Sequence, residues 1–199
     1  MAGKLSGKRI AILATDGVEE VELTQPRDAV TAEGAQVDVI SLEEGELQAM
    51  NHDIEPASTF PVDTTAAQAS PSDYDALILP GGTVNADRLR MDADVQSFVR
   101  EIFRAGKPVG VICHGPWTLI DAGVVEGRTL TSYPSLRTDL RNAGAKVVDE
   151  EVVTDEGLVS SRNPGDLDAF CAKIVEEFAE GAHPQQQVDM TSHDQGATA

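Results

Sequence analysis

The sequence predicts an α/β protein whose mostly parallel sheet is covered by helices on both faces. Three observations predict this class. Short apolar runs recur along the chain, amphipathic helical patterns lie between them, and turn residues separate the two kinds of segment. Because parallel strands need crossover connections, strands that alternate with helices indicate a sheet that is buried on both sides.

Four apolar runs are predicted to be the buried strands of this sheet. They span residues 9–14, 36–42, 76–79 and 108–112. Short strands are also predicted at 146–148, 151–154 and 158–160, with a turn at 155–157. Residues 43–70 hold scattered apolar residues, two prolines and many threonines and alanines, a pattern that predicts short edge strands and loops.

Helices are predicted where apolar residues return every three or four positions. These segments are 24–33, 94–104, 135–143 and 165–180. The first begins at Thr24, a residue type that commonly caps helix N-termini. Cys171 lies on the apolar side of the last helix and is predicted to be a core residue.

The composition is that of a globular and strongly acidic protein. Hydrophobic residues make up 41% of the 199 residues, which excludes a wholly disordered or collagen-like chain. The chain carries 34 acidic and 15 basic residues, for a formal net charge of −19. Such a surface repels phosphate backbones and anionic lipids, so neither nucleic acid nor a membrane is an expected partner.

We expect a single domain over residues 1–180 and a polar tail over residues 181–199. The tail is rich in Gln, His and Asp, a composition typical of disorder. No run approaches about 18 apolar residues, and the first apolar run is too short for a signal peptide. Two cysteines are too few for a disulfide scaffold, so a reducing cytoplasm is the predicted location.

The string Gly110-Val-Ile-Cys-His-Gly-Pro is the main chemical candidate. A buried strand ends before Cys113 and a helix is predicted just after Gly115, so the cysteine is expected at a sharp turn of the nucleophile-elbow type. N–H groups at the helix start, including that of Gly115, would favour a thiolate and stabilise an oxyanion. His114 would act as base or acid. The alternative is that Cys113 is a small buried hydrophobe.

A cluster of acidic residues follows the first strand, at positions 16–22. Glu19 lies in the turn that leaves the same sheet edge as Cys113, so we expect it to approach the sulfur. A carboxyl group buried there would have a raised pKa and would donate a hydrogen bond to a thiolate. Glu20 and Glu22 are interpreted as acidic residues that complement the helix dipole.

A glycine pair and three histidines complete the candidates. Gly81 and Gly82 permit a tight turn after the third buried strand and are predicted to offer an N–H group to an oxyanion. His52 in a loop, and His183 and His193 in the tail, are predicted to be solvent-facing and inert.

These motifs resemble the PfpI family of the ThiJ/PfpI superfamily. The similarity extends from about residue 8 to residue 178 and covers Asp16 to Leu23, Leu79-Pro-Gly-Gly, Ile112-Cys-His-Gly-Pro, Thr131-Ser-Tyr-Pro and Val159-Ser-Ser-Arg. The resemblance implies a flavodoxin-like, three-layer α/β/α sandwich. Class I glutamine amidotransferases share this fold but carry a late His-x-Glu, whereas Pro and Gln follow His183, so amidotransferase activity is not expected.

The resemblance also implies roles for individual residues. Cys113 would be the nucleophile, Glu19 the protonated glutamate near its sulfur, and His114 the catalytic histidine. An acidic residue from a neighbouring subunit would orient the histidine. Asp87 matches that position, although it comes one residue late and is shorter than the family's common glutamate. The site would then form only in a homo-oligomer, either a dimer or a hexamer.

The leading expectation is a cysteine-nucleophile enzyme of stress defence that acts on carbonyl groups. It would be a PfpI-type intracellular peptidase, or a glyoxalase or deglycase. A small reactive carbonyl is favoured over a peptide substrate because the sequence shows no peptide-binding groove. The alternative is a non-catalytic redox sensor or chaperone that uses oxidation of Cys113. No cofactor is expected, since neither a phosphate loop nor metal-ligand spacing is found.

Overall fold

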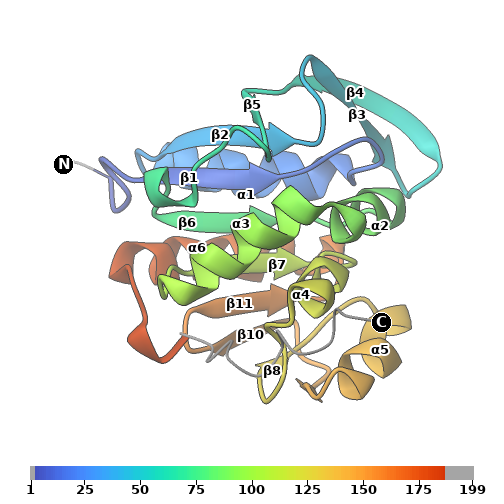
Figure 1. Ribbon diagram of the computed structural model, residues 1–199, viewed down its shortest axis with the longest axis vertical. Coiled ribbons are helices and arrows are strands. Elements are labelled where there is room, and N and C mark those ends of the chain that lie inside the picture. The colour runs from blue at the N-terminus through green and yellow to red at the C-terminus, as the bar shows by residue number, and fades with distance from the viewer. Residues whose placement is uncertain (1–2, 187–199) are drawn as a thin grey trace, which may run out of the picture.

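The structure is a computed structural model that describes residues 3–186, and its elements alternate along the chain (Figure 1). The strands are β1 (Arg9–Leu13), β2 (Gln36–Ser41), β3 (Glu46–Asn51), β4 (Glu55–Pro61), β5 (Thr64–Thr65), β6 (Ala76–Leu79), β7 (Val109–Ile112), β8 (Thr129–Leu130), β9 (Lys146–Val147), β10 (Val152–Asp155) and β11 (Leu158–Ser161). The helices are α1 (Glu20–Ala32), α2 (Thr83–Met91), α3 (Ala93–Arg104), α4 (Pro116–Ala122), α5 (Arg137–Asn142) and α6 (Leu167–Glu180).

A seven-stranded sheet forms the middle layer of the protein. Its strand order is β10-β11-β7-β6-β1-β2-β5. Only the pair of β10 and β11 in this sheet is antiparallel. The predicted flavodoxin-like α/β class with a mostly parallel sheet is therefore confirmed. Strands β3 and β4 pair as a separate hairpin, and β8 pairs with β9.

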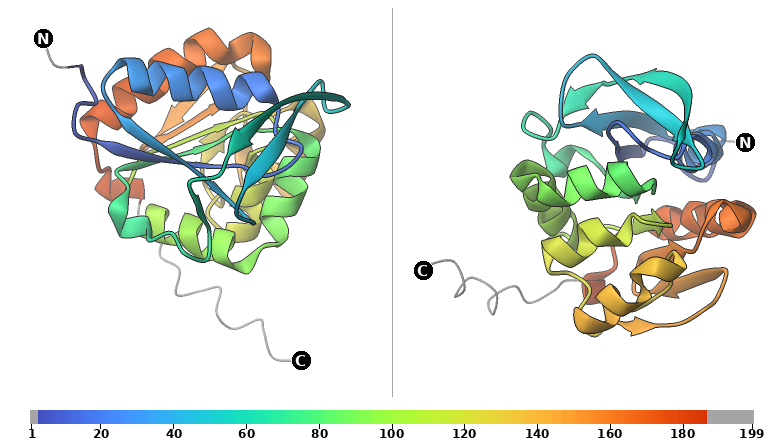
Figure 2. Two further views of the ribbon diagram at one scale, coloured as in Figure 1. Left: turned by 90° about the horizontal axis from the view of Figure 1, so that it is seen from above. Right: turned by 90° about the vertical axis from the view of Figure 1, so that its right-hand side faces the viewer.

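Helices cover both faces of the sheet, as the two views of Figure 2 show. On one face, α1 and α6 contact each other and pack on the sheet through residues such as Leu23 and Phe170. On the other face, α2 to α5 pack around a second apolar cluster that includes Phe98, Phe103 and Leu140. Central strands such as β6 are buried along their whole length, which explains their continuous apolar runs.

Helix α1 begins at Glu20, four residues before the predicted start. Thr24 does not cap this helix, because its hydroxyl donates a hydrogen bond of 2.9 Å to the Glu20 carbonyl one turn earlier. The buried side of the helix carries Glu22, Pro26 and Val30, which recur every four residues. The earlier start therefore places Glu22 on the face that packs against the protein.

Helix α2 follows the Gly81–Gly82 turn and occupies a segment for which the sequence analysis predicted no helix. It has no apolar stripe, since its buried residues are Asn85, Ala86 and Leu89. Polar bonds anchor it instead: Asn85 donates to the carbonyls of Pro80 and Gly81 and accepts from the Thr15 N–H. A helix held by a buried amide escapes detection by hydrophobic periodicity.

Two predictions on single residues need correction. Cys171 is only partly buried and packs at the margin of the core. His183 is half-buried rather than solvent-facing, because its N–H donates to the Gly106 carbonyl at 2.7 Å and ties the chain to the sheet. His193 and most of the predicted tail lie outside the described residues.

The carboxyl ends of β1, β6, β7 and β11 lie side by side. The register aligns Ile12 with Ile78, Leu79 with Val111, and Ile112 with Ser161. The loops that leave these four strands therefore converge at one edge of the sheet, which is where open α/β sheets bind ligands.

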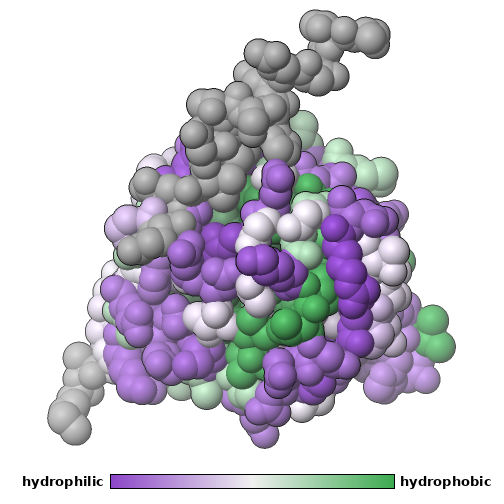
Figure 3. Space-filling view, turned by 90° about the horizontal axis from the view of Figure 1, so that it is seen from below, coloured by the Kyte–Doolittle hydropathy of each residue, from purple (hydrophilic) through white to green (hydrophobic). Residues whose placement is uncertain are grey.

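The described surface is mostly hydrophilic, in keeping with the high net charge. Figure 3 shows this for one face, where an apolar patch is surrounded by polar residues. None of the helices within residues 3–186 combines the length and apolar character that crossing a bilayer requires.

Candidate active site

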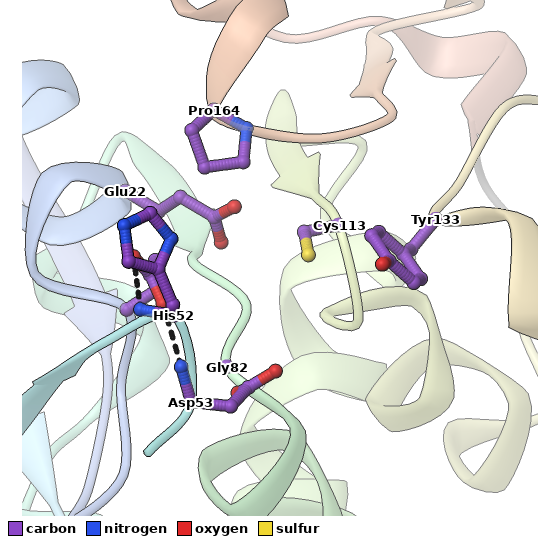
Figure 4. A pocket seen from close by; sticks show the side chains of 8 residues that line it. Glu22, His52, Asp53, Gly82, Cys113, Tyr133 and Pro164 are labelled. Atoms are coloured by element: carbon purple, nitrogen blue, oxygen red, sulfur yellow. Dashed lines mark hydrogen bonds between the residues drawn. The ribbon is translucent and has the colours of Figure 1, made fainter. Parts of the chain in front are cut away.

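Cys113 lies at the sharp turn between β7 and α4, as predicted. Its φ is +61°, a left-handed conformation that non-glycine residues seldom adopt. Its N–H donates to the Ser161 carbonyl at 3.1 Å, and its carbonyl accepts from the Tyr133 N–H at 3.0 Å. These bonds hold the strained residue in place, and its sulfur points into a cavity at the sheet edge (Figure 4).

His114 places one ring nitrogen beside the sulfur. Its Nδ1 is 3.2 Å from Cys113 Sγ. The ring stacks on Tyr133 with centroids 4.6 Å apart, and it meets Trp117 edge-on. Burial lowers the pKa of His114, and the Asp53 carboxylate partly offsets this effect. The imidazole is therefore neutral at neutral pH and can accept a proton from the thiol.

The carboxyl group beside the sulfur belongs to Glu22 and not to Glu19. Glu22 is fully buried, lies against Cys113, and accepts a hydrogen bond of 2.8 Å from the Gly81 N–H. Its Oε1 has no hydrogen-bond partner within the described part of the chain. Burial raises the pKa of Glu22 to about 8, so it is largely protonated at neutral pH. The predicted protonated carboxyl therefore lies three residues further along.

Glu19 occupies a different part of the same cavity. It is the residue before α1, but its side chain does not cap the helix. Its carboxylate instead accepts from the N–H groups of His52 at 3.1 Å and Asp53 at 3.3 Å. The prediction that Glu19 touches the sulfur failed because the helix start was placed too late. The four-residue spacing of Glu22, Pro26 and Val30 is the sequence signal that identifies the inward-facing glutamate.

The Cys113 thiol is buried, with 6% of the residue exposed. Burial, together with the charge of Glu22 when ionised, raises the pKa of the thiol, while the N–H groups of Gly82 and His114 that face the sulfur act in the opposite direction. The sequence analysis predicted that Cys113 is a thiolate, but this environment favours the protonated thiol. A neutral thiol beside a neutral imidazole is favoured instead, and attack by sulfur would need His114 as a base.

Of the three glycines predicted to face an oxyanion, only Gly82 turns its N–H toward the sulfur. The Gly81 N–H binds Glu22, and the Gly115 N–H donates to the Ile112 carbonyl at 2.9 Å. Gly81 is nevertheless required for close approach, because a Cβ at this position would lie 2.6 Å from Cys113 Cβ. The second N–H beside the sulfur is that of His114.

The cavity above the sulfur has a volume of about 200 Å³. It is lined by Glu19, Glu22, His52, Asp53, Gly82, Cys113, Tyr133 and Pro164. His52 is exposed, as predicted, and it also borders the cavity. Tyr133 comes from the Thr131-Ser-Tyr-Pro motif, although its place in the cavity was not predicted. Asp53 and Pro164 belong to no motif, and only the fold brings their loops to the cavity.

Comparison with known proteins identifies the family to which these motifs belong. The model of the DJ-1/PfpI family matches residues 8–177, nearly the whole of the predicted domain. The chain belongs to the DJ-1/PfpI family. This membership confirms the resemblance that the sequence motifs indicated.

Relatives within the DJ-1/PfpI family match along most of the chain. The deglycase PfpI of Pyrococcus furiosus is 40% identical over 167 residues, which cover 84% of this chain and 97% of the relative. Drosophila melanogaster DJ-1beta shares 32% identity with a TM-score of 0.78, covering 86% of this chain and 90% of that one. A two-domain protein of Anabaena variabilis with DJ-1/ThiJ/PfpI-like and ferritin-like domains has a TM-score of 0.81 at 30% identity, covering 94% of this chain and 52% of that one.

Asp87, the match to the acidic residue that the family resemblance implies from a neighbouring subunit, lies exposed on α2. Within the described part of this chain it does not contact His114. Its supply to a neighbour's site, and with it the homo-oligomer, stays a prediction.

One group of side chains in the described residues has the spacing of a metal site. Glu177, Glu180 and His183 offer ligand atoms within 4.8 Å of one another at the end of α6. His183 is tied to Gly106, just before β7 begins, so the group lies at the opposite sheet edge from Cys113. It takes no part in the site described here.

The pKa of Glu22 makes stability depend on pH. Its pKa is about 8 in the folded chain, against an ordinary value of 4.5. The contribution of Glu22 to the free energy of unfolding is therefore fully present below pH 4.5 and is lost as the pH rises through 8. The loss amounts to about 5 kcal/mol at most. We expect the free energy of unfolding of Glu22→Gln, relative to wild type, to rise between pH 5 and pH 8 in urea titrations. A constant difference across this range would contradict the prediction.

Proposed function

We propose that this protein is a glyoxalase- or deglycase-type enzyme that uses Cys113 on small 2-oxoaldehydes, or on their early adducts with thiols and amines. The observation that carries this proposal is the placement of one thiol between a protonated carboxyl, Glu22, and a neutral imidazole, His114. The relatives named deglycases, at about 40% identity over nearly their whole length, support it.

The size of the cavity supports a small substrate. Its volume of about 200 Å³ falls below the roughly 300–1,000 Å³ typical of pockets for drug-sized ligands. A small oxoaldehyde fits such a space, whereas a polypeptide needs an extended groove. The size of the cavity therefore favours a glyoxalase or deglycase activity over a peptidase activity.

The first step is attack by sulfur on the aldehyde carbon. His114 Nδ1 takes the thiol proton across the 3.2 Å contact as the carbon–sulfur bond forms. The carbonyl oxygen gains a proton from Glu22, and the N–H groups of Gly82 and His114 stabilise charge that develops near the sulfur. The product is a hemithioacetal on Cys113, next to an ionised Glu22.

The second step moves a hydrogen between two substrate carbons. The Glu22 carboxylate removes the hydrogen from the carbon bonded to sulfur and returns it to the neighbouring carbon, while His114 relays protons between the two oxygens. The aldehyde carbon is oxidised to a thioester as the ketone carbon is reduced, so no outside oxidant is consumed. Water then hydrolyses the thioester to a 2-hydroxy acid and restores the thiol.

The proposal is tested by incubating the purified protein with methylglyoxal and measuring both its loss and the formation of lactate. We expect lactate to appear in amounts that match the methylglyoxal consumed, over many turnovers. A parallel incubation with a fluorogenic peptide should show no cleavage. Peptide cleavage without lactate would instead support the peptidase.

A third experiment tests the alternative that the protein is a non-catalytic redox sensor. After mild peroxide treatment, intact-mass analysis shows whether Cys113 gains oxygen atoms. Selective oxidation of Cys113 in a protein that turns over no carbonyl substrate would overturn the enzyme proposal in favour of a sensor.

A further inference from the structure

A chain of hydrogen bonds leads from His114 to an acidic residue of the same chain. The Thr83 hydroxyl lies 3.4 Å from His114 Nε2. The same hydroxyl donates a bond of 3.0 Å to Asp53 Oδ2, and the Thr83 N–H donates to Asp53 Oδ1 at 2.6 Å. Asp53 therefore accepts hydrogen bonds from both the backbone N–H and the hydroxyl of Thr83 at the start of α2.

The direction of these bonds determines which nitrogen of His114 carries the proton. An ionised carboxylate only accepts hydrogen bonds, so Thr83 must give its single hydroxyl proton to Asp53. The Thr83 oxygen is then left to accept from His114 Nε2. The proton of a neutral His114 consequently lies on Nε2, and the lone pair on Nδ1 points at the sulfur.

We propose that Asp53, acting through Thr83, is a positioning residue that keeps the His114 proton on Nε2 and leaves Nδ1 free to accept the Cys113 proton. This inference rests on the proposed function, in which His114 is the base. The family resemblance implies that a carboxylate from a neighbouring subunit orients the histidine. Here the chain supplies an orienting carboxylate to its own site.

The position of Glu19 supports this role for Asp53. His52 and Asp53 both have left-handed backbones, with φ of 54° and 65°. The Glu19 carboxylate binds the N–H groups of both residues, and the Met50 N–H donates to the Val18 carbonyl at 2.8 Å. The buried Glu19 thus holds the end of the β3–β4 hairpin so that the Asp53 side chain reaches Thr83.

Ser135 offers a second partner to the same ring nitrogen, with its Oγ 3.3 Å from His114 Nε2. Its hydroxyl is able to donate as well as accept, so by itself it does not select a tautomer. Thr83 does select a tautomer, because its hydroxyl donates its only proton to Asp53 and is left to accept from His114. Loss of the carboxylate charge is therefore expected to matter more than loss of the threonine hydroxyl.

The decisive variant is Asp53→Asn. An asparagine amide keeps the bond from the Thr83 N–H, so the start of α2 keeps its partner, but its NH₂ group donates to the Thr83 oxygen. The Thr83 proton then turns toward His114 Nε2 and favours the tautomer with the proton on Nδ1, which leaves no acceptor beside the sulfur. Thr83→Val removes the relay, and Thr83→Ser restores it.

The experiment combines ¹⁵N NMR of the His114 ring in the full chain with steady-state kinetics on methylglyoxal. In wild type and Thr83→Ser we expect an unprotonated Nδ1 and a protonated Nε2. In Asp53→Asn the proton should move to Nδ1, and kcat should fall about 10- to 100-fold with KM unchanged. Thr83→Val should lie between these two cases. Asp168→Asn and Thr59→Val, both at exposed positions away from the cavity, are the matched controls.

The two readouts separate the possible failures. An unchanged Nε2 tautomer in both Asp53→Asn and Thr83→Val would overturn the inference, even if activity fell. A tautomer shift without loss of kcat would also overturn it. Absence of turnover in the wild-type protein would remove the proposed function alone, because the NMR signals report the His114 proton whether or not a substrate reacts.

Discussion

Replacement of Cys113 by alanine is expected to abolish turnover of methylglyoxal, with kcat/KM falling at least about 10³-fold. No other side chain in the cavity offers a nucleophile of comparable strength at the position that Gly82 and His114 N–H groups face. Without the sulfur no covalent adduct forms, and Glu22 has no adjacent substrate carbon to act on. Lactate formation, followed over many turnovers, measures the loss.

Cys171→Ala is the matched control for this variant. Cys171 lies on α6, is partly buried, and belongs to the apolar margin of the core rather than to the cavity. Its removal should leave lactate formation unchanged. A Cys113→Ala protein that retains its rate, or a Cys171→Ala protein that loses it, would show that the reaction does not proceed through the elbow cysteine.

Glu22→Gln is expected to reduce turnover about 10²- to 10⁴-fold, the range typical for loss of a general acid or base. Glutamine still accepts the Gly81 N–H, so the loop geometry is kept. Its amide neither releases nor takes up a proton near neutral pH, so the hydrogen transfer between substrate carbons loses its carrier. The decrease should appear in kcat, measured with methylglyoxal at pH 7.

The same variant should make the thiol easier to ionise. The charge that Glu22 bears when ionised helps to raise the pKa of Cys113, and glutamine carries none. We therefore expect faster alkylation of Cys113 by iodoacetamide in Glu22→Gln at pH 9, where Glu22 of the wild type is ionised, together with the slower turnover at pH 7. Glu20→Gln, a half-buried position in the same helical turn, should change neither rate. Parallel loss of turnover and alkylation would indicate a collapsed site instead of a missing proton carrier.

Local rules predicted the elbow and most of the sheet. The apolar run at 108–112 became β7, and the glycine and proline after Cys113 started a helix, because strand ends and helix starts depend on a few neighbouring residues. The predicted turn at 155–157 has positive φ at Glu156 and Gly157, as a tight hairpin requires. These features are encoded within short segments.

Such rules did not predict helix α2, and they predicted short strands within residues 43–70 without showing that β3 and β4 pair as a separate hairpin. The helix depends on the buried amide of Asn85, whose partners lie in loops after two other strands. The hairpin is tied to the start of α1 through Glu19 and Met50. Contacts between distant segments stabilise both elements, so hydrophobic periodicity along one segment carries little trace of them.

From the sequence alone came the parallel α/β architecture, the edge of the sheet where chemistry is concentrated, and the adjacent Cys113 and His114. Backbone geometry and the alternation of segments are sufficient for these. The tertiary structure decided that Glu22 rather than Glu19 meets the sulfur, that the thiol is buried beside a protonated carboxyl, and that Asp53 reaches His114 through Thr83. Each of these depends on the rotation of a helix or on the meeting of loops from different strands, and a protonation state follows from the neighbours that this packing supplies.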